Sequence, residues 1–250
     1  MFSHNNNNNN NFDFSGQQSQ GIAVPRTFIA NVFSWMAVAL AITAFFAYYF
    51  STSEAFFKSL YVINETTGKA GMSGIGWIVM LSPFAIVLVM SFGLNKLSAP
   101  FLTFLFIIYA FLMGMSLSFI FFTYTSSSIF LTFAVTAGTF GVMAIAGYTT
   151  KIDLSKFGSL MFMGLVGVII ASLANMFMKS EKLDWIISIV GVLVFTGLTA
   201  WDVQKLKRIG TSVEQGSDSA KKSTIMGALT LYLDFINLFL FLLRFMGNRK

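Results

Sequence analysis

Two aspartates lie in stretches of the sequence that are otherwise apolar enough to cross a membrane. Asp234 stands near the middle of residues 227–244, GALTLYLDFINLFLFLLR, and Asp202 closes an earlier apolar segment. A charged aspartate at the centre of a spanning helix costs roughly 3 kcal/mol, and such residues usually face a bundle interior or a water-filled cavity. Both carboxyl groups are therefore candidate functional groups.

Such a pair can share a proton and bind a cation. Two carboxylates close together in a low-dielectric interior repel each other, so Asp202 and Asp234 would share one proton and respond to pH as a unit. Carboxylate oxygens are also the ligands that Ca²⁺ prefers, which makes the pair a candidate calcium site or the lining of a calcium path. A structural alternative stays open. Asp202 would then face lipid headgroups beside Lys205 and Arg208, while Asp234 would pair with Asn175 or with backbone.

Polar residues recur at spacings of three and four along the helix expected around Asp234, where they form one stripe: Gly227, Thr230, Asp234 and Asn237. Polar groups at membrane depth need partners, so this stripe should face the protein interior, with the opposite face also largely covered by other helices. Thr199, one turn before Asp202, and Asn175, in another apolar segment, are further candidate supporting groups.

The composition excludes a soluble protein. Apolar residues make up 56% of the 250 positions and charged residues only 10%, and several uncharged runs reach the roughly 20 residues that span hydrocarbon. The net charge of +6 does not predict a nucleic-acid partner, because the basic residues lie mostly beside the apolar runs, where positive charge orients helices in the bilayer.

Enzyme chemistry and resident cofactors are not predicted. The chain has no cysteine, and its one histidine, His4, precedes every apolar segment, which argues against thiolate sites, membrane metalloproteases and rhomboid-type proteolysis. Intramembrane aspartic proteases carry a Gly-x-Gly-Asp motif. Here Asp234 stands in Tyr-Leu-Asp-Phe and Asp202 in Ala-Trp-Asp-Val, so neither matches.

The apolar segments predict an all-α integral membrane protein. A polar, asparagine-rich tail at residues 1–26 is expected to be disordered, and residues 27–250 form the membrane domain. Seven spans are expected, at residues 27–50, 74–94, 99–122, 129–150, 157–178, 184–201 and 227–244. Residues 51–73 and 204–222 are expected to be polar loops.

The distribution of charge predicts that the amino terminus lies in the cytoplasm. With seven spans, nine basic residues fall in inside segments and four in outside loops. Arg244, Arg249 and Lys250 disagree, since they would lie outside unless the last segment were re-entrant. We favour seven crossings, because residues 227–243 are as apolar as the other spans and have no central Gly or Pro.

Two further expectations concern how the helices meet. The small-residue pairs Ala137 with Gly141 and Gly167 with Ala171, with Gly164 nearby, predict close helix packing. Depth is a difficulty for the aspartates: Asp202 lies about 26 Å along its predicted span and Asp234 about 16 Å beyond Ser223. They meet only if the last helix begins in water, before it enters hydrocarbon.

Four stretches in order along the chain carry a resemblance to a known family: GYTTKIDLSKFG at 147–158, GLVGVIIASLAN at 164–175, TAWDVQKLK at 199–207, and LYLDFINLFLFLLR at 231–244. In these segments the chain resembles the Bax inhibitor family, also called the transmembrane Bax inhibitor motif family, and especially its bacterial members. The resemblance implies seven helices, with the last at the centre of two three-helix layers. It also implies a pH-sensitive calcium leak governed by an aspartate pair, at Asp202 and Asp234 here.

Two departures from the family pattern concern gating. Trp201 and Val203 flank Asp202 where Tyr and Thr are usual, which removes a hydroxyl that can bond the carboxylate. Some members carry an arginine on helix two that latches to the aspartates, whereas residues 74–94 contain no basic residue. Lys96 is the remaining candidate, and its ammonium cannot fork onto two carboxylates as a guanidinium does.

The predicted function is a pH-sensitive calcium or cation leak in the inner membrane of a bacterium. Its expected partners are the lipid bilayer and Ca²⁺. Two alternatives remain: a non-conducting protein that binds other membrane proteins, such as quality-control proteases, and a proton-coupled transporter.

Overall fold

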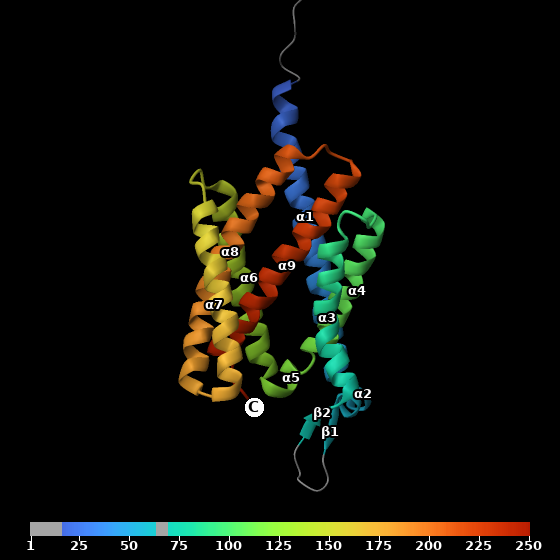
Figure 1. The fold of residues 1–250 in the computed structure, drawn as a ribbon, viewed down its shortest axis with the longest axis vertical. Helices are drawn as coiled ribbons and strands as arrows, with labels where there is room; N and C mark the ends of the chain where they lie inside the picture. Colours follow the sequence, from blue (N-terminus) through green and yellow to red (C-terminus); the bar gives the residue numbers. More distant parts are fainter. Residues whose placement is uncertain (1–16, 64–69) are drawn as a thin grey trace, which may run out of the picture.

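The computed structural model describes residues 17–63 and 70–250, which are almost entirely helical (Figure 1). The elements in order are α1 Gln17–Ser51, α2 Glu54–Leu60, β1 Tyr61–Ile63, β2 Ala70–Met72, α3 Gly74–Gly93, α4 Ala99–Leu117, α5 Ile120–Thr123, α6 Ser126–Thr149, α7 Ser155–Met178, α8 Glu181–Ser212 and α9 Asp218–Met246. Residues 1–16 lie outside the described part, so disorder there stays a prediction, whereas residues 17–26, which the predicted tail also included, are helical and begin α1.

Seven helices of the described chain are long and apolar enough to cross a membrane, α4 and α5 counting as one continuous span. This confirms the predicted all-α membrane fold and its seven spans. Serine side chains fix where three of these helices start: Ser73, Ser180 and Ser217 accept hydrogen bonds from backbone N–H groups in the first turns of α3, α8 and α9. Such caps satisfy donors that have no partner inside the helix.

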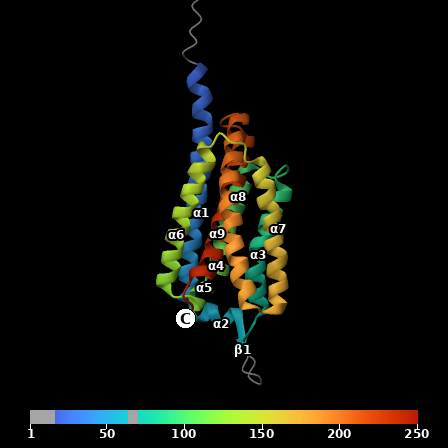
Figure 2. The ribbon, with the colours of Figure 1, turned by 90° about the vertical axis from the view of Figure 1, so that its left-hand side faces the viewer.

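Helix α9 occupies the centre of the bundle. In Figure 1 it runs obliquely between a layer of α6, α7 and α8 and a layer of α1, α3 and α4, and in Figure 2 it again lies in the middle of the bundle. It packs against α8, α1, α6 and α4, and most of its spanning residues are buried. The predicted position of the last helix is thus confirmed.

The charged stretch at residues 204–222 is mostly helical, contrary to the predicted long loop. Helix α8 continues to Ser212 and α9 begins at Asp218, which leaves only residues 213–217 between them. Glutamine, lysine, leucine and arginine are good helix formers, so the helix does not end where it leaves hydrocarbon. The loop predicted at residues 51–73 likewise contains α2 and the antiparallel β1–β2 pair.

These longer helices resolve the difficulty of depth. Helix α9 has 29 residues, so it is about 44 Å long and exceeds the roughly 30 Å of hydrocarbon. Helix α9 therefore starts well before the bilayer, which places Asp234 at a depth where it can contact Asp202. The same continuous helix leaves no place for a re-entrant turn.

The predicted small-residue contacts are mostly wrong. A Cβ at Gly141 or Gly167 would meet nothing within 4 Å, and Ala137 is exposed. A pair of small residues shows that backbones can approach, but not which face of the helix points at a neighbour. Gly164 does pack against Val194. A close approach between two helices occurs instead at Gly147, where a Cβ would overlap the backbone of Ala200.

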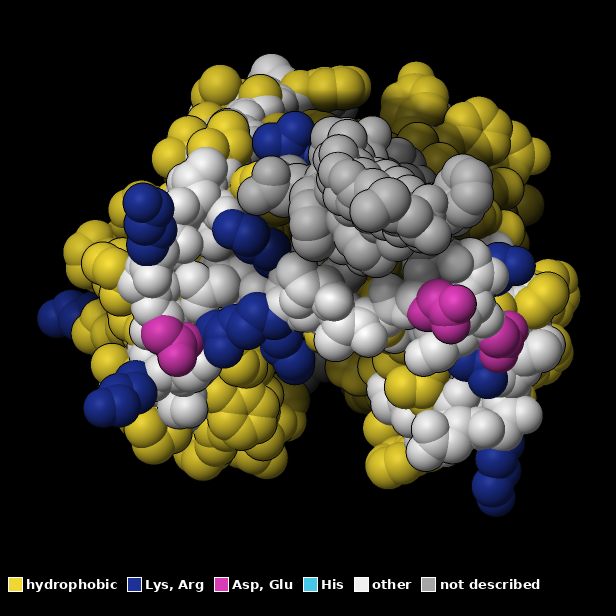
Figure 3. All heavy atoms as spheres, turned by 90° about the horizontal axis from the view of Figure 1, so that it is seen from above, with side chains coloured by type: hydrophobic (Ala, Val, Ile, Leu, Met, Phe, Trp, Pro, Cys, Tyr) yellow, Lys and Arg dark blue, Asp and Glu magenta, His cyan; other side chains and the backbone are white. Residues whose placement is uncertain are grey.

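The two ends of the bundle differ in charge. Residue 17 and the carboxyl terminus lie at opposite ends (Figures 1 and 2). Figure 3 looks onto the end where α1 begins, and Lys and Arg side chains gather there between apolar flanks. At this end the α6–α7 loop carries the exposed residue Lys151, and the ends of α8 and α9 carry the exposed residues Lys205, Arg208 and Lys221. This arrangement fits the positive-inside rule with that end in the cytoplasm.

We predict that single cysteines at Ser15 and Asn248 react from opposite sides of the membrane, because an odd number of spans separates them. The natural chain has no cysteine, so each site is measured alone. An impermeant maleimide applied to intact and to opened vesicles makes the comparison. A cysteine at Gln215, exposed in the α8–α9 turn, is the control and should react like Ser15. Labelling of Ser15 and Asn248 from the same side would contradict seven crossings.

Candidate functional site

The side chains of Asp202 and Asp234 meet inside the bundle. Asp202 projects from α8 and Asp234 from α9, and the two residues are only 7% and 5% exposed. A side-chain hydrogen bond links their carboxyl groups. Because a carboxylate has no hydrogen to donate, a bond between two carboxyl groups requires a proton on one of them. The structure therefore holds the pair in a geometry that suits one shared proton.

The second oxygen of Asp234 has no partner. Its Oδ2 atom is buried and makes no hydrogen bond. The nearby hydroxyls are already committed, since Thr199 donates to the Phe195 carbonyl and Thr230 to the Met226 carbonyl. A buried carboxylate oxygen without a donor disfavours the ionised form. The polar contact that the structure shows for the Asp234 carboxyl group is therefore the one with Asp202.

The other predicted supporting groups are used differently. Asn237 donates from Nδ2 to the Leu233 carbonyl of its own helix. Asn175 lies at the opposite end of the bundle, where its Oδ1 accepts from the Ser180 N–H and its Nδ2 donates to Asp184. Asn175 therefore does not pair with Asp234, which was one of the two partners that the structural alternative offered.

Asp184 anchors the carboxyl-terminal end of α9. Its carboxylate forms an ion pair with Arg244 and lies 3.8 Å from the guanidinium of Arg249. The turn between α7 and α8 is thereby tied to the end of the central helix. From the sequence, Asp184 was predicted only to start a span, because nothing in the sequence indicates that residues sixty positions apart meet.

Lys205 follows Asp202 by three residues on α8, and its positive charge interacts with the Asp202 carboxyl group. Its ammonium lies 5.2 Å from the centre of the Trp201 ring. Lys96, the candidate latch, is exposed in the turn between α3 and α4, whereas Asp202 is buried. Asp202 also does not face headgroups, because its carboxyl group meets Asp234.

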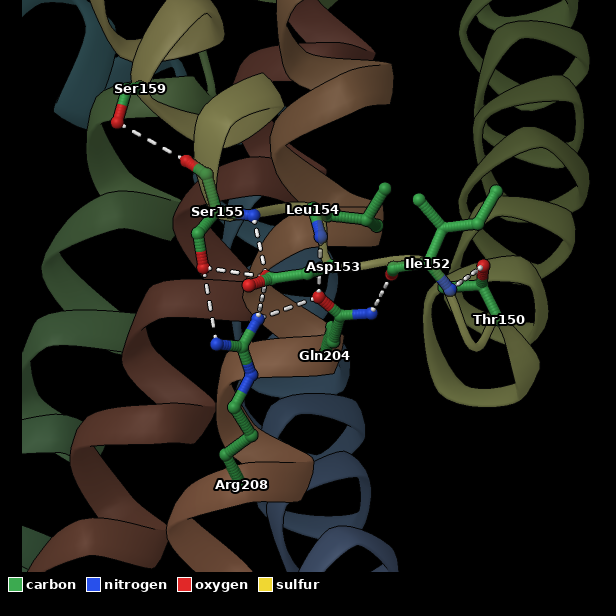
Figure 4. Close-up of polar contacts among 8 residues, drawn as sticks. All are labelled: Thr150, Ile152, Asp153, Leu154, Ser155, Ser159, Gln204 and Arg208. Carbon is green, nitrogen blue, oxygen red and sulfur yellow. Dashed lines mark hydrogen bonds and ion pairs between the residues drawn. The ribbon is translucent and has the colours of Figure 1, made fainter.

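Residues of α8 just beyond Asp202 form hydrogen bonds with the loop between α6 and α7 (Figure 4). The Gln204 amide donates to the Ile152 carbonyl and accepts from the Leu154 N–H, both at 2.8 Å. Arg208 donates to Asp153 at 2.8 Å and to Gln204 at 2.7 Å. We call Gln204, Arg208 and residues 152–155 the polar clamp. It joins the two family motifs at 147–158 and 199–207.

The polar clamp fixes the rotation of α8 about its own axis. Gln204 follows Asp202 by two residues, which is about 200° around a helix. The face that binds the loop is therefore nearly opposite the face that presents Asp202 to α9. This role was not predicted, because Gln204 and Arg208 were expected to lie in a loop. The polar side chains inside the family motif were the available signal.

We predict that Gln204→Ala lowers the free energy of unfolding by about 1–2 kcal/mol, because it leaves the Leu154 N–H and the Ile152 carbonyl without partners. Thermal unfolding of the purified protein in detergent measures this. Asp153→Ala is the comparison and should cost less than Gln204→Ala, since its ion pair with Arg208 is exposed and screened by water. Equal losses for the two variants would contradict a special role for Gln204.

The Asp153 ion pair adds a weak acid dependence. Hydrogen bonds from the Ser155 side chain and backbone, together with Arg208, hold the pKa of Asp153 below its usual range. Its contribution to stability is therefore present at neutral pH and is lost as the pH falls through that lowered value.

Across residues 17–63 and 70–250, no three His, Cys, Asp or Glu side chains lie together as a metal site. Calcium bound tightly in proteins has six to eight oxygen ligands. The two carboxyl groups of Asp202 and Asp234 can contact a passing cation but are too few for a tight resident site.

Known proteins resemble this chain along most of its length. It is 47% identical over 238 residues to the inner membrane protein YbhL of Escherichia coli K12, covering 93% of this chain and 98% of that protein. Uncharacterized proteins of Borreliella burgdorferi and Rickettsia prowazekii are 44% identical over 234 residues, covering 94% of this chain and 97% of theirs, and 40% over 225 residues, covering 90% and 91%. The family model described as inhibitor of apoptosis-promoting Bax1 matches residues 25–250. The chain belongs to this Bax inhibitor family of membrane proteins.

Proposed function

We propose that this protein is a pH-sensitive calcium leak of the bacterial inner membrane, gated by Asp202 and Asp234. The observation that carries the proposal is the contact of two buried carboxyl groups between α8 and the central helix α9. A membrane fold that buries two acids against each other forgoes the stability that apolar side chains would give there. A switch is a function that requires this arrangement.

The gate follows from the charge on the pair. At acidic pH the shared proton holds Asp202 against Asp234, and α8 and α9 stay packed. When both groups are ionised, two like charges face each other in a medium of low dielectric constant, where their repulsion is much larger than in water. Separation relieves the repulsion, loosens α9 and exposes carboxylate oxygens to which a cation can bind.

Calcium is proposed as the permeant ion and not as a resident ligand. Two carboxylates attract a divalent cation, and a site with so few ligands also releases it, which conduction requires. The clamp at Gln204 and Arg208 holds α8 on its far side, so the movement falls mainly on α9. No resident cofactor is part of this proposal.

Flux into liposomes that contain this protein alone tests the function. Calcium entry, read with a trapped indicator, should occur without a partner protein and should rise with pH. A protein that acts only by binding other membrane proteins would conduct nothing in this assay. A proton-coupled transporter would need its solute before it moved protons. Absence of calcium flux at every pH would overturn the leak and favour the non-conducting alternative.

A further inference from the structure

A second feature of the bundle lies away from the aspartates, between α3, α4 and α9. A cavity of about 670 Å³ opens there, and nearly all its lining side chains are apolar. Its volume is in the range of pockets that hold small apolar ligands. Leu233, Ile236 and Leu240 bring α9 to its wall, while Val79 and Val87 come from α3.

The polar atoms of this wall are already satisfied or enclosed. Ser116 donates to the Val79 carbonyl, Ser118 to the Met115 carbonyl, and Asn237 to the Leu233 carbonyl. Tyr109 contributes its ring, while its hydroxyl is inaccessible to solvent and makes no hydrogen bond. The cavity therefore has little to offer water, and an apolar cavity of this kind stays dry unless an apolar molecule fills it.

The cavity is open toward the bilayer. Met80, Phe84 and Leu88 form part of its wall and are 42%, 67% and 54% exposed on the outer side of α3. All three belong to a membrane-spanning helix. The medium outside this opening is lipid, and an empty space beside it would cost the lining residues their dispersion contacts.

The length of the cavity matches one leaflet. Along α3 its lining runs from Gly76, next to the end that carries the β1–β2 pair, to Leu88. Twelve residues of helix correspond to about 18 Å, and half of a 30 Å hydrocarbon core is about 15 Å. A partner helix does not fit, because a helix about 10 Å across and 18 Å long occupies about 1,400 Å³.

We propose that this cavity binds one acyl chain of a phospholipid from the leaflet at the carboxyl-terminal end of the protein. The chain enters beside Gly76 and its methyl end reaches the level of Leu88 and Leu233. It packs on the one half-buried stripe of α9 in this region, Leu233, Asn237 and Leu240. The inference does not depend on calcium conduction.

Photolabelling of the full-length protein in liposomes tests the site. The probe is a phospholipid with a diazirine at the end of one acyl chain, and adducts are located by peptide mass spectrometry. We expect adducts on Leu233, which lines the cavity at the level of the methyl end of the chain, and fewer on Leu240 nearer the entrance. Ile170, exposed on α7, reports contact with bulk lipid. Labelling of Ile170 without Leu233 would overturn the proposal.

Filling the cavity should abolish the labelling of α9. Val87→Trp fills it from α3 and Met113→Trp from α4, so the test survives if one variant fails to fold. Both should lose adducts at Leu233 and keep those at Ile170. Val142→Trp, on the exposed face of α6, is the matched control and should change neither. Undiminished labelling of Leu233 in a folded cavity variant, or a crosslinked dimer through this wall, would contradict acyl-chain binding.

Discussion

Replacing Asp234 by asparagine is expected to abolish the pH dependence of calcium flux. An amide of the same shape can stay next to Asp202, but it cannot exchange a proton with it. In the wild-type protein a one-proton switch changes the open fraction by at most about tenfold per pH unit. Flux of Asp234→Asn should instead be flat when liposomes are scanned from about pH 5 to about pH 8, a range across which a buried carboxyl pair can titrate.

Asp202→Asn should remove the pH dependence as well, even if its resting flux differs from that of Asp234→Asn, because the proton belongs to the pair. Asp218→Asn is the matched control. Asp218 begins the same helix, is exposed and forms a surface ion pair with Lys222, so its variant should keep the wild-type profile. Retention of that profile by either variant of the pair would refute the shared-proton gate.

The membrane fold was predictable because its signal is local and strong. Apolar length alone defined the seven spans, and their limits agree with the helices to within a few residues wherever a polar turn follows directly. The limits failed at α8 and α9, since hydropathy marks where a helix leaves hydrocarbon and not where it ends. Residues 204–212 and 218–226 are polar and still helical.

The candidate site was predictable in part. Asp202 and Asp234 stand out singly because each is an acid in an apolar run, but their contact came from the family resemblance. Side-chain partners were harder to predict. Asn175 was expected near the aspartates and binds Asp184 at the other end, since a buried amide signals only that some partner exists. The polar clamp joins residues about fifty positions apart, and no local pattern carries that information.

The packing of α6 on α8 shows the same limit for small residues. Gly141 and Gly147 are both glycines of α6, and only Gly141 belongs to a small-residue pair that was predicted to mark close helix packing. Only the second faces a neighbour: a Cβ at Gly147 would overlap the carbonyl group of Ala200, two residues before Asp202, whereas one at Gly141 meets nothing. The two positions therefore form a matched pair for experiment.

Gly147→Ala is expected to destabilise the protein by about 1–3 kcal/mol, while Gly141→Ala should be neutral or slightly stabilising. The added methyl at Gly147 meets backbone, which cannot rotate away as a flexible side chain does, so α6 must shift from α8. At Gly141 the methyl points into open space and alanine favours the helix. Thermal unfolding in detergent compares the two. Because the shift would occur beside Asp202, Gly147→Ala should also raise calcium flux at acidic pH, where the wild-type pair is closed. Equal unfolding temperatures for the two variants would show that α6 and α8 do not meet at Gly147.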